Sequence, residues 1–320
     1  MFPKTENCRP KSVLFPPVAV LTGPTGVGKT ALAIHLAQEL GAQIVNADSL
    51  QVYRELDIGT AKPTWEERSL VPHHLLDVVF PDQDFDAATY SQWGRRIIAE
   101  LHSRGIPPLV VGGTGLYIRA LLYGILADGV QDEAVRQALR EEAASGGLEP
   151  LYERLCRQDP QTAARLHPHD EFRILRALEV MAASGRKMSE QQQEHRFADC
   201  PYQIRKIALS RPREELYARI DTRVEAMLAQ GLVAEVQDLW RRYPSHLKPL
   251  QSLGYRHIGG YIQGDSTWEE AVAGLKRDTR RYAKRQLTWL RADPEIHWLE
   301  PSRYESALEL LGDFFASWQG

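Results

Sequence analysis

Cysteine is scarce in this chain, and its scarcity argues against two classes of protein. The 320 residues contain three cysteines, Cys8, Cys156 and Cys200. None of them stands in a C-x-x-C or Cys/His spacing, so the sequence predicts neither a disulfide scaffold nor a zinc module. We expect ordinary reduced thiols.

Long apolar runs and a strong excess of one charge are also missing. No uninterrupted apolar stretch approaches the roughly 18 residues that a membrane span requires, so we expect no membrane association. The first seventeen residues hold four prolines and mixed charges without a signal-peptide core, which favours a flexible tail and a cytoplasmic location. The net charge is −3, from 39 Lys+Arg against 42 Asp+Glu, so any surface for nucleic acid must be local.

What the chain does contain is a phosphate-binding loop. Residues 23–30 read Gly-Pro-Thr-Gly-Val-Gly-Lys-Thr and lie between an apolar run at 18–21 and a helical run at 31–37. In this G-x-x-x-x-G-K-[ST] pattern the glycines let backbone N–H groups approach an anion, and the next helix adds its positive dipole end. We expect Lys29 to bridge phosphate oxygens and Thr30 to hold Mg²⁺. A plain glycine turn is the alternative, but a turn alone does not explain why Lys and Thr follow the glycines.

The alternation of short apolar runs with amphipathic runs predicts the fold. Strands expected at 18–21, 43–46 and 109–111 alternate with helical stretches at 31–40 and 90–104, which is typical of βαβ units. The sequence therefore predicts an α/β fold, a P-loop NTPase-like parallel sheet flanked by helices, with an inserted all-helical subdomain.

The domain limits follow from a change in the pattern of residues along the chain. After residue 123 the chain becomes helical and charged, until a strand-like stretch at 204–209 returns it to the core. We expect further helices over 213–243 and 267–291. The predicted parts are a flexible tail (1–17), a core with C-terminal helices (18–123 and 202–320) and a helical insertion that contacts RNA (124–201).

Two polar residues follow expected strands, at the edge of the sheet where ligands gather. Asp48 would lie beside bound phosphate and metal, where a carboxylate can bind Mg²⁺ through water or accept a proton. Local sequence supports a helix-capping Asp equally well. Thr114 stands between glycines and is either a hydroxyl that contacts a leaving phosphate or a turn residue. His73-His74 lacks further ligands at a suitable spacing, so we place no metal there.

A basic helix is expected near the C-terminus. Residues 276–291 contain seven basic residues and one acid. At about 100° per residue, Leu275, Tyr282 and Trp289 lie on one side and anchor the helix to the protein. The opposite half collects Lys276, Arg277, Arg280, Arg281, Lys284 and Arg285. A solvated charged face is the plain interpretation, but six cations on a half that we expect to be free of acids favour a polyanion such as RNA. A second basic set lies in the insertion: Arg173, Arg176, Arg186 and Lys187.

Two common classes of P-loop protein are disfavoured. The chain has no Asn-Lys-x-Asp, which a GTPase would use to select guanine. The run at 109–111 leads into Gly-Gly-Thr, where an ATP-driven motor would end its strand in Asp. A small-molecule kinase, or a transferase with pyrophosphate as leaving group, remains.

At this point the chain resembles the tRNA dimethylallyltransferases, also called tRNA isopentenyltransferases, and the bacterial type in particular, because no zinc finger follows the core. The resemblance rests on ordered motifs from residue 18 to residue 291: the loop at 23–30, Asp-Ser-Leu-Gln-Val-Tyr (48–53), Asp-Ile-Gly-Thr-Ala-Lys-Pro (57–63), Pro-His-His-Leu-Leu-Asp (72–77), Gly-Gly-Thr-Gly-Leu-Tyr (112–117), Phe-Arg-Ile-Leu-Arg-Ala-Leu-Glu-Val (172–180), Leu-Gly-Tyr-Arg (253–256) and Ala-Lys-Arg-Gln-Leu-Thr-Trp-Leu-Arg (283–291).

The resemblance implies a reaction. Family members transfer a dimethylallyl group from dimethylallyl diphosphate to N6 of the adenosine 3′-adjacent to the anticodon, in tRNAs that read codons beginning with U. Asp48 would take the proton from the adenine amine, and Thr114 would help to align the base and the diphosphate. Mg²⁺ on Thr30 and the ammonium of Lys29 would neutralise the departing diphosphate.

The resemblance also implies binding residues and partners. The diphosphate would be held by Gly23, Pro24, Thr25, Gly26, Val27, Gly28, Lys29, Thr30 and Arg223. The expected tRNA contacts are Asp48, Ser49, Leu50, Gln51, Thr114, Arg136, Phe172, Arg173, Ile174, Leu175, Arg176, Gln251, Ser252, Leu253, Gly254, Tyr255 and Arg256, with Arg281 and Arg285 from the basic helix. The partners are therefore the tRNA anticodon stem-loop and dimethylallyl diphosphate, with no obligate protein partner.

Overall fold

The computed structural model describes residues 15–124, 133–195 and 200–319. Most of the expected tail, and the expected start of the insertion up to residue 132, lie outside the described residues. The chain divides into two compact units. We call them the core unit, formed by the chain up to Leu122 and from Pro201 onward, and the helical unit, Tyr123–Cys200.

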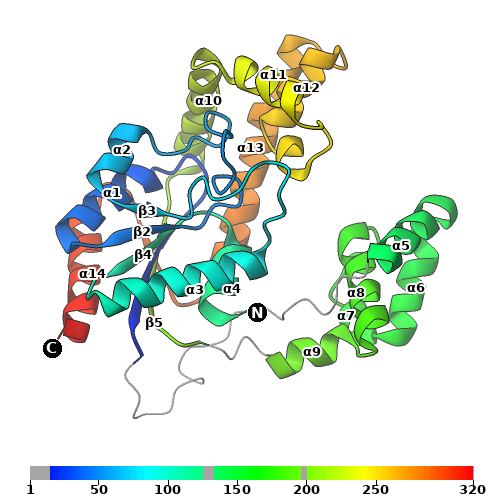
Figure 1. The fold of residues 1–320 in the computed structure, drawn as a ribbon, viewed down its shortest axis with the longest axis horizontal. Coiled ribbons are helices and arrows are strands. Elements are labelled where there is room, and N and C mark those ends of the chain that lie inside the picture. Colours follow the sequence, from blue (N-terminus) through cyan, green and yellow to red (C-terminus); the bar gives the residue numbers. More distant parts are fainter. Residues whose placement is uncertain (1–14, 125–132, 196–199, 320) are drawn as a thin grey trace. The chain divides into compact units, whose positions relative to one another are not determined.

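The core unit contains one parallel sheet of six strands, in the order β3-β2-β4-β1-β5-β6. Figure 1 shows this sheet, with β2, β3, β4 and β5 labelled. The strands are β1 (Pro17–Thr22), β2 (Gln43–Asn46), β3 (His73–His74), β4 (Pro108–Val111), β5 (Gln203–Leu209) and β6 (Ile296–Leu299). The central β1 pairs with β4 on one side and with β5 on the other. A strand so placed is covered on both faces, and this explains why its residues 18–21 form a continuous apolar run.

Helices cover both faces of the sheet. The crossovers that carry α1 (Lys29–Leu40) and α3 (Ala87–Ser103) run in opposite directions along the sheet. Because such crossovers are right-handed, the two helices lie on opposite faces. The C-terminal α14 (Tyr304–Gln319) packs beside α1, and Leu311, Phe314 and Phe315 join the main core there. Between β2 and α3 lies the short α2 (Trp65–Leu70).

The order of the strands creates a point where the direction of the connections reverses. The chain leaves β1 toward β2 and leaves β4 toward β5, so the loops after these two adjacent strands diverge. Ligands in open α/β sheets bind at such a switch point, outside the carboxyl ends of the strands. The loops after β1, β4 and β2 are those that carry residues 23–30, Thr114 and Asp48.

The core unit has further helices. One, α4 (Gly115–Tyr123), follows β4, and the others follow β5: α10 (Arg213–Ala229), α11 (Leu232–Arg242), the short 3₁₀ helix η2 (Lys248–Gln251), α12 (Tyr255–Gln263) and α13 (Trp268–Arg291). The stretch expected as helical over 213–243 consists of two helices. The helical backbone is interrupted at Gly231, whose φ is 103°. The long α13 begins with a capping box between Thr267 and Glu270.

The helical unit has a core of its own. Its helices are α5 (Glu133–Gly146), α6 (Glu149–Gln158), α7 (Pro160–Ala163), α8 (Glu171–Ser184) and α9 (Met188–His195). Leu139, Leu151, Leu155, Ile174 and Leu178 form an apolar cluster separate from the core of the sheet. The buried Asp159 caps α7 through Thr162 and also accepts from the backbone N of Ser189 at 2.8 Å, which ties α9 to the bundle.

Candidate active site

The loop after β1 has the backbone conformation that its glycines permit. Gly23, Gly26 and Gly28 have φ of 144°, 80° and 107°, a region that residues with a Cβ rarely enter. Gly28 is the N-cap of α1, which begins at Lys29. Free N–H groups of the first helical turn and the positive end of the helix dipole therefore meet at this loop. The loop is built as an anion cradle.

The side chain of Lys29 folds over the loop. Its Nζ donates to the carbonyl oxygens of Gly23 and Pro24, both at 2.9 Å. Burial lowers the pKa of Lys29 to about 8, assisted by repulsion from Arg223 and opposed by Asp48. Burial lowers the pKa of Arg223 as well, and Asp48 again opposes the shift. An anion between Lys29 and Arg223 would relieve their repulsion, which is the electrostatic setting of a phosphate site.

Two further arginines brace the loop from its carbonyl side. Arg211 Nε donates to Val27 O at 2.9 Å, and Arg219 Nε donates to Gly26 O at 3.0 Å. A cation on a carbonyl oxygen polarises that peptide unit and strengthens the N–H at its other end as a donor. Arg211 thus acts on the N–H of Gly28. The sequence patterns did not single out these two residues, which come from the segment before α10 and from α10 itself.

Asp48 and Thr114 follow neighbouring strands, and hydrogen bonds join their loops. Thr114 N donates to Ala47 O at 3.1 Å, and Ser49 N donates to Thr114 Oγ1 at 3.0 Å. The strand ends approach closely, because a Cβ on Gly112 would lie 2.1 Å from Ala47 O. The edge therefore holds Asp48 and Thr114 in one hydrogen-bonded unit.

The Asp48 carboxylate caps a turn with one of its two oxygens. Its Oδ1 accepts from Leu50 N at 2.9 Å and Gln51 N at 3.4 Å, which makes it a turn cap. Its Oδ2 has no hydrogen-bond partner among the residues described. One oxygen thus fixes the orientation of the carboxylate, and the other is available to a substrate.

One face of helix α13 contacts this site. Gln286 lies against the loop at 23–30 and the Gly-Gly-Thr turn, and the indole of Trp289 packs so close to Gly115 that a Cβ there would meet it at 2.6 Å. Tyr282 lies on the same helix, one turn before Gln286. Burial and the charge of Asp48 raise the pKa of Tyr282 to about 12, and a hydrogen bond with Thr114 opposes the rise. The sequence predicted Tyr282 and Trp289 as anchors, but it did not place them beside Asp48 and Thr114.

Glu235 on α11 organises the loop that follows Asp48 in the sequence. Its carboxylate accepts from the backbone N of Ile58 at 2.7 Å and of Gly59 at 3.0 Å, and from Tyr255 Oη at 2.6 Å. The next residues of this loop bind Gln51, whose amide donates to the carbonyl oxygens of Thr60 and Ala61. Gln51, predicted to contact RNA, thus also holds the loop in place.

The expected RNA-binding segment 251–256 is only partly accessible. Gln251 and Arg256 are exposed, and Arg256 pairs with Asp278 at 2.9 Å. Ser252 and Leu253 are half-buried, and Gly254, with φ 91°, is buried. Tyr255 is fully buried, with its hydroxyl on Glu235. The ring of Tyr255 therefore belongs to the core, and the contact of this segment with RNA stays a prediction.

The expected RNA-binding residues of the helical unit divide in the same way. Phe172 is 81% exposed, and Arg173, also exposed, pairs with Asp170 at 2.6 Å. Leu175 is half-buried. Ile174 is fully buried in the cluster of the unit, so its side chain packs and does not face a ligand.

A buried carboxylate joins the other two arginines expected to bind RNA. Glu179, 3% exposed, pairs with Arg136 and with Arg176, each at 2.9 Å, and Arg136 also reaches Glu133 at 3.0 Å. These guanidinium groups are partly neutralised within the unit. Each keeps only the hydrogen-bonding capacity that the carboxylates leave.

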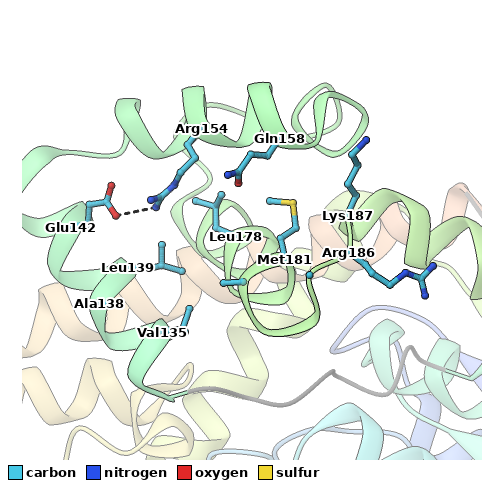
Figure 2. Close-up of a pocket in the computed structure, with 12 residues that line it drawn as sticks. Val135, Ala138, Leu139, Glu142, Arg154, Gln158, Leu178, Met181, Arg186 and Lys187 are labelled. Atoms are coloured by element: carbon cyan, nitrogen blue, oxygen red, sulfur yellow. Dashed lines mark hydrogen bonds and ion pairs between the residues drawn. The ribbon is translucent and has the colours of Figure 1, made fainter.

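A groove of about 520 Å³ crosses the helical unit. Figure 2 shows its apolar floor, with Leu139, Leu178 and Met181, and polar side chains at its rim. Arg154 pairs with Glu142 there at 3.0 Å, while Arg186 and Lys187 lie at the end where α8 runs toward α9. Two members of the second basic set of the sequence thus belong to one groove.

The basic half of α13 is not free of acids, contrary to the sequence-based expectation. Neighbouring α10 supplies Glu225 to Lys276 and Asp221 to Arg280, the latter at 2.8 Å. Asp278 of the same helix pairs with Arg277 and Arg281, each at 3.3 Å. Lys284 and Arg285 are exposed and have no carboxylate partner in the part of the chain that the structure describes. The unpaired positive charge of this face is therefore concentrated at Lys284 and Arg285.

The residues at the loop at 23–30 fit a magnesium ion that is held mainly by the phosphate oxygens of a bound substrate. No group of three or more His, Cys, Asp or Glu side chains in the described ranges could hold a metal. Mg²⁺ does not require one, since it keeps several waters and takes few protein oxygens beside substrate phosphates. The Thr30 hydroxyl in the first turn of α1, with Asp48 within electrostatic reach of Lys29, suits that mode. The histidine pair in β3 serves the fold, since His74 Nε2 bonds to Gln43 at 2.8 Å.

Comparison with known proteins gives a consistent result. The family model described as IPP transferase matches residues 51–293, and the model for the ATPase family associated with various cellular activities (AAA) matches residues 19–69. A tRNA dimethylallyltransferase of Syntrophobacter fumaroxidans is 54% identical over 300 residues, which are 93% of this chain and 88% of that protein. One from Geobacter metallireducens is 48% identical over 300 residues, 93% and 97% of the two chains.

Solved structures agree with the sequence relatives. The full-length tRNA isopentenylpyrophosphate transferase of Bacillus halodurans superposes with a TM-score of 0.71 at 36% identity, over 94% of this chain and 97% of that one. A eukaryotic dimethylallyltransferase acting on tRNA gives a TM-score of 0.82 at 27% identity, over 94% and 80%.

Proposed function

Because this chain belongs to the tRNA dimethylallyltransferase (IPP transferase) family, we propose that it transfers a dimethylallyl group from dimethylallyl diphosphate to N6 of the adenosine 3′-adjacent to the anticodon. The tRNAs modified are those that read codons beginning with U. The observation that carries the proposal is the meeting of an anion cradle, Thr114 and Asp48 at the carboxyl ends of β1, β4 and β2. The family assignment replaces the small-molecule kinase as an interpretation of the P-loop.

The loop at 23–30 holds the leaving group. In the transfer, N6 of adenine forms a bond to C1 of the allyl group while the C1–O bond breaks, and the electron pair leaves with the diphosphate. Lys29 and Arg223, already crowded against one another, gain stabilisation as negative charge grows between them. The N–H of Gly28, polarised through Arg211, adds a donor at the same place.

Asp48 accepts the proton that N6 loses. An aromatic amine is a weak nucleophile, so a positioned base contributes to its attack. Oδ1 is fixed by the backbone of Leu50 and Gln51, which leaves Oδ2 to accept the proton. Thr114 holds the neighbouring turn through Ser49 and thereby aligns Asp48 with the loop that binds the diphosphate.

Thr30 would hold Mg²⁺, which when bound supplies a Lewis acid for the diphosphate oxygens. The chain itself contributes the ammonium of Lys29 and the backbone of the loop. We place this reaction in the cytoplasm. Within the described ranges, every helix is too short or too polar to cross a lipid bilayer.

The proposal is tested by incubating the protein with Mg²⁺, dimethylallyl diphosphate and unmodified tRNA, followed by mass spectrometry of the nucleosides. We expect N6-dimethylallyladenosine in tRNAs that read U-initial codons. A parallel reaction with ATP and a metabolite pool tests the kinase interpretation, and phosphorylation without prenyl transfer would contradict the proposal.

The pKa of Lys29 predicts how donor binding depends on pH. Without ligand this ammonium loses its proton as the pH rises through about 8, and only the protonated form attracts the diphosphate. The Kd for dimethylallyl diphosphate should be flat from pH 7 to 8 and then rise about tenfold per pH unit. Calorimetric titration between pH 7 and 9.5 measures this, with Lys29→Arg as the variant that stays charged. A Kd independent of pH in the natural protein would contradict the assignment.

The exposed cations of α13 predict a salt-dependent contribution to tRNA binding. Lys284→Ala and Arg285→Ala should weaken the binding of all tRNAs alike, and each should lower the slope of log K against log salt by about 0.7 to 0.9, the value for one lost phosphate contact. Lys276→Ala is the matched control, because Lys276 is engaged by Glu225. Filter binding at several salt concentrations measures the slopes, and unaltered slopes would make this face an ordinary solvated surface.

A further inference from the structure

Gln286 touches both loops of the proposed site at once. It stands on α13, only 8% exposed, between the loop that binds the diphosphate and the Gly-Gly-Thr turn. Its Oε1 accepts from Thr25 N at 2.9 Å, and its Nε2 donates to Gly113 O at 2.9 Å. One side chain thus joins the loops that follow β1 and β4.

These two bonds use one acceptor and one donor of the neutral amide. Glutamine offers an acceptor and a donor on one planar group, whereas Glu offers acceptors only and Met offers neither with useful strength. The bond to Thr25 also means that this N–H is engaged by the protein, so the phosphate must be held by other donors of the loop. The amide therefore shapes the cradle without taking a place in it.

Gly113 confirms how closely the amide is seated. A Cβ on this glycine would lie 2.3 Å from Gln286 Nε2, and the next nearest atom outside Gln286 is Gly23 O at 3.4 Å. The backbone of Gly113 does not have positive φ, so conformation alone does not demand glycine. The requirement comes from Gln286, because any larger residue would displace its amide from the carbonyl.

We propose that Gln286 is a positioning residue of the transfer reaction, which fixes the distance between the diphosphate loop and the turn that carries Thr114. Thr114 is bonded to Ser49, beside Asp48, so the amide sets the separation of the leaving group from the base. This inference rests on the proposed function. It goes beyond it by assigning to α13 a role in alignment in addition to RNA binding.

The expected consequence is a loss of rate without a loss of binding. A misplacement of about 1 Å between reacting groups costs on the order of 100-fold in rate. Gln286→Met keeps the length and volume of the side chain but removes both bonds. We expect kcat to fall about 10- to 100-fold, while the KM for tRNA, the affinity for inorganic diphosphate and the melting temperature change little.

Three variants separate positioning from simple stability. Gln286→Glu keeps an acceptor for Thr25 N but places a carboxylate against Gly113 O. Its kcat should fall at least as far as that of Gln286→Met, and its affinity for diphosphate should also fall. Gln237→Met, at an exposed position of α11, is the matched control and should behave as the natural protein. Gln286→Asn, too short for both bonds, should not restore the rate.

A double-mutant comparison tests the contact itself. Gly113→Ala should displace the amide and cost about as much kcat as Gln286→Ala. Because both changes break the same contact, Gly113→Ala combined with Gln286→Ala should be no slower than the slower single variant. Effects that multiply would overturn the proposal.

The readouts also distinguish this inference from the proposed function. If the natural protein prenylates no tRNA, the proposed function fails. If it does so and Gln286→Met keeps kcat within twofold, only the positioning role fails. The role is equally overturned if kcat falls only in proportion to lost diphosphate affinity or melting temperature, since that pattern means general damage to the loop.

Discussion

Replacement of Asp48 by Asn should lower the rate of prenyl transfer by at least about 100-fold and leave tRNA binding unchanged. General bases contribute about 10²- to 10⁴-fold, and the amide cannot take the proton of N6. The amide oxygen can still accept from the backbone of Leu50 and Gln51, where Asp48 Oδ1 now accepts at 2.9 and 3.4 Å. Asn therefore removes the base and keeps the turn. Single-turnover kinetics with saturating tRNA measure the effect.

Asp86→Asn is the control for this prediction. Asp86 is also a capping carboxylate, which accepts from Thr89 N at 2.8 Å at the start of α3. It should retain the rate, because the amide preserves the cap. If Asp48→Asn turned over at the natural rate, Asp48 would be only a turn cap. If both Asp variants lost the rate equally, the loss would reflect capping.

Replacement of Lys29 by Met should weaken the binding of dimethylallyl diphosphate by at least about 30-fold. Removing one partner of a buried, hydrogen-bonded charge pair costs about 2–5 kcal/mol. The change also removes the bonds from Nζ to Gly23 O and Pro24 O. The affinity for tRNA alone should be unchanged, because the loss is confined to the diphosphate.

Lys248→Met removes one exposed positive charge of the core unit and is the control. Calorimetry with inorganic diphosphate and with dimethylallyl diphosphate compares the two variants. A Lys29→Met protein that bound both diphosphates as tightly as the control variant would remove Lys29 from the binding site.

The order of strands and helices could be predicted because it is written in local patterns. Alternating apolar and amphipathic runs gave β1, β2, β4 and the helices between them, and the glycines of residues 23–30 required a particular turn. The short edge strands β3 and β6 and the break at Gly231 were not predicted. Two-residue and half-exposed strands carry little periodicity, and a single glycine in a helical run is ambiguous by sequence alone.

The candidate site was predictable where its residues lie beside strand ends and not where they come from distant helices. Asp48 and Thr114 follow strands, so topology placed them. Gln286 meets Thr25 across 261 positions and Gly113 across 173, a relation that no local pattern encodes. One signal was present: at about 100° per residue, Gln286 is a polar residue on the side of α13 that carries Leu275, Tyr282 and Trp289.

For the positive charge of α13, the sequence predicted more unpaired cations than the structure contains. The spacing of cations on α13 was correct, but their neutralisation depended on Asp221 and Glu225 of α10, whose proximity only the fold provides. Helical winding also placed Asp278 just outside the basic half, although its short side chain reaches Arg277 and Arg281. Net surface charge must therefore be counted after the helices are packed.

The pairing of β1 between β4 and β5 also has a consequence for how the nascent chain folds. On the ribosome, β1 emerges first and gains one neighbour when β4 follows. Its other edge stays open until Gln203–Leu209 has emerged from the exit tunnel, which happens only after the helical unit has emerged. During that interval the most apolar strand of the sheet presents free N–H and C=O groups, which invites wrong pairing. A pause in translation before β5 would therefore lengthen the vulnerable period, and chaperone capture of the nascent chain should be greatest there.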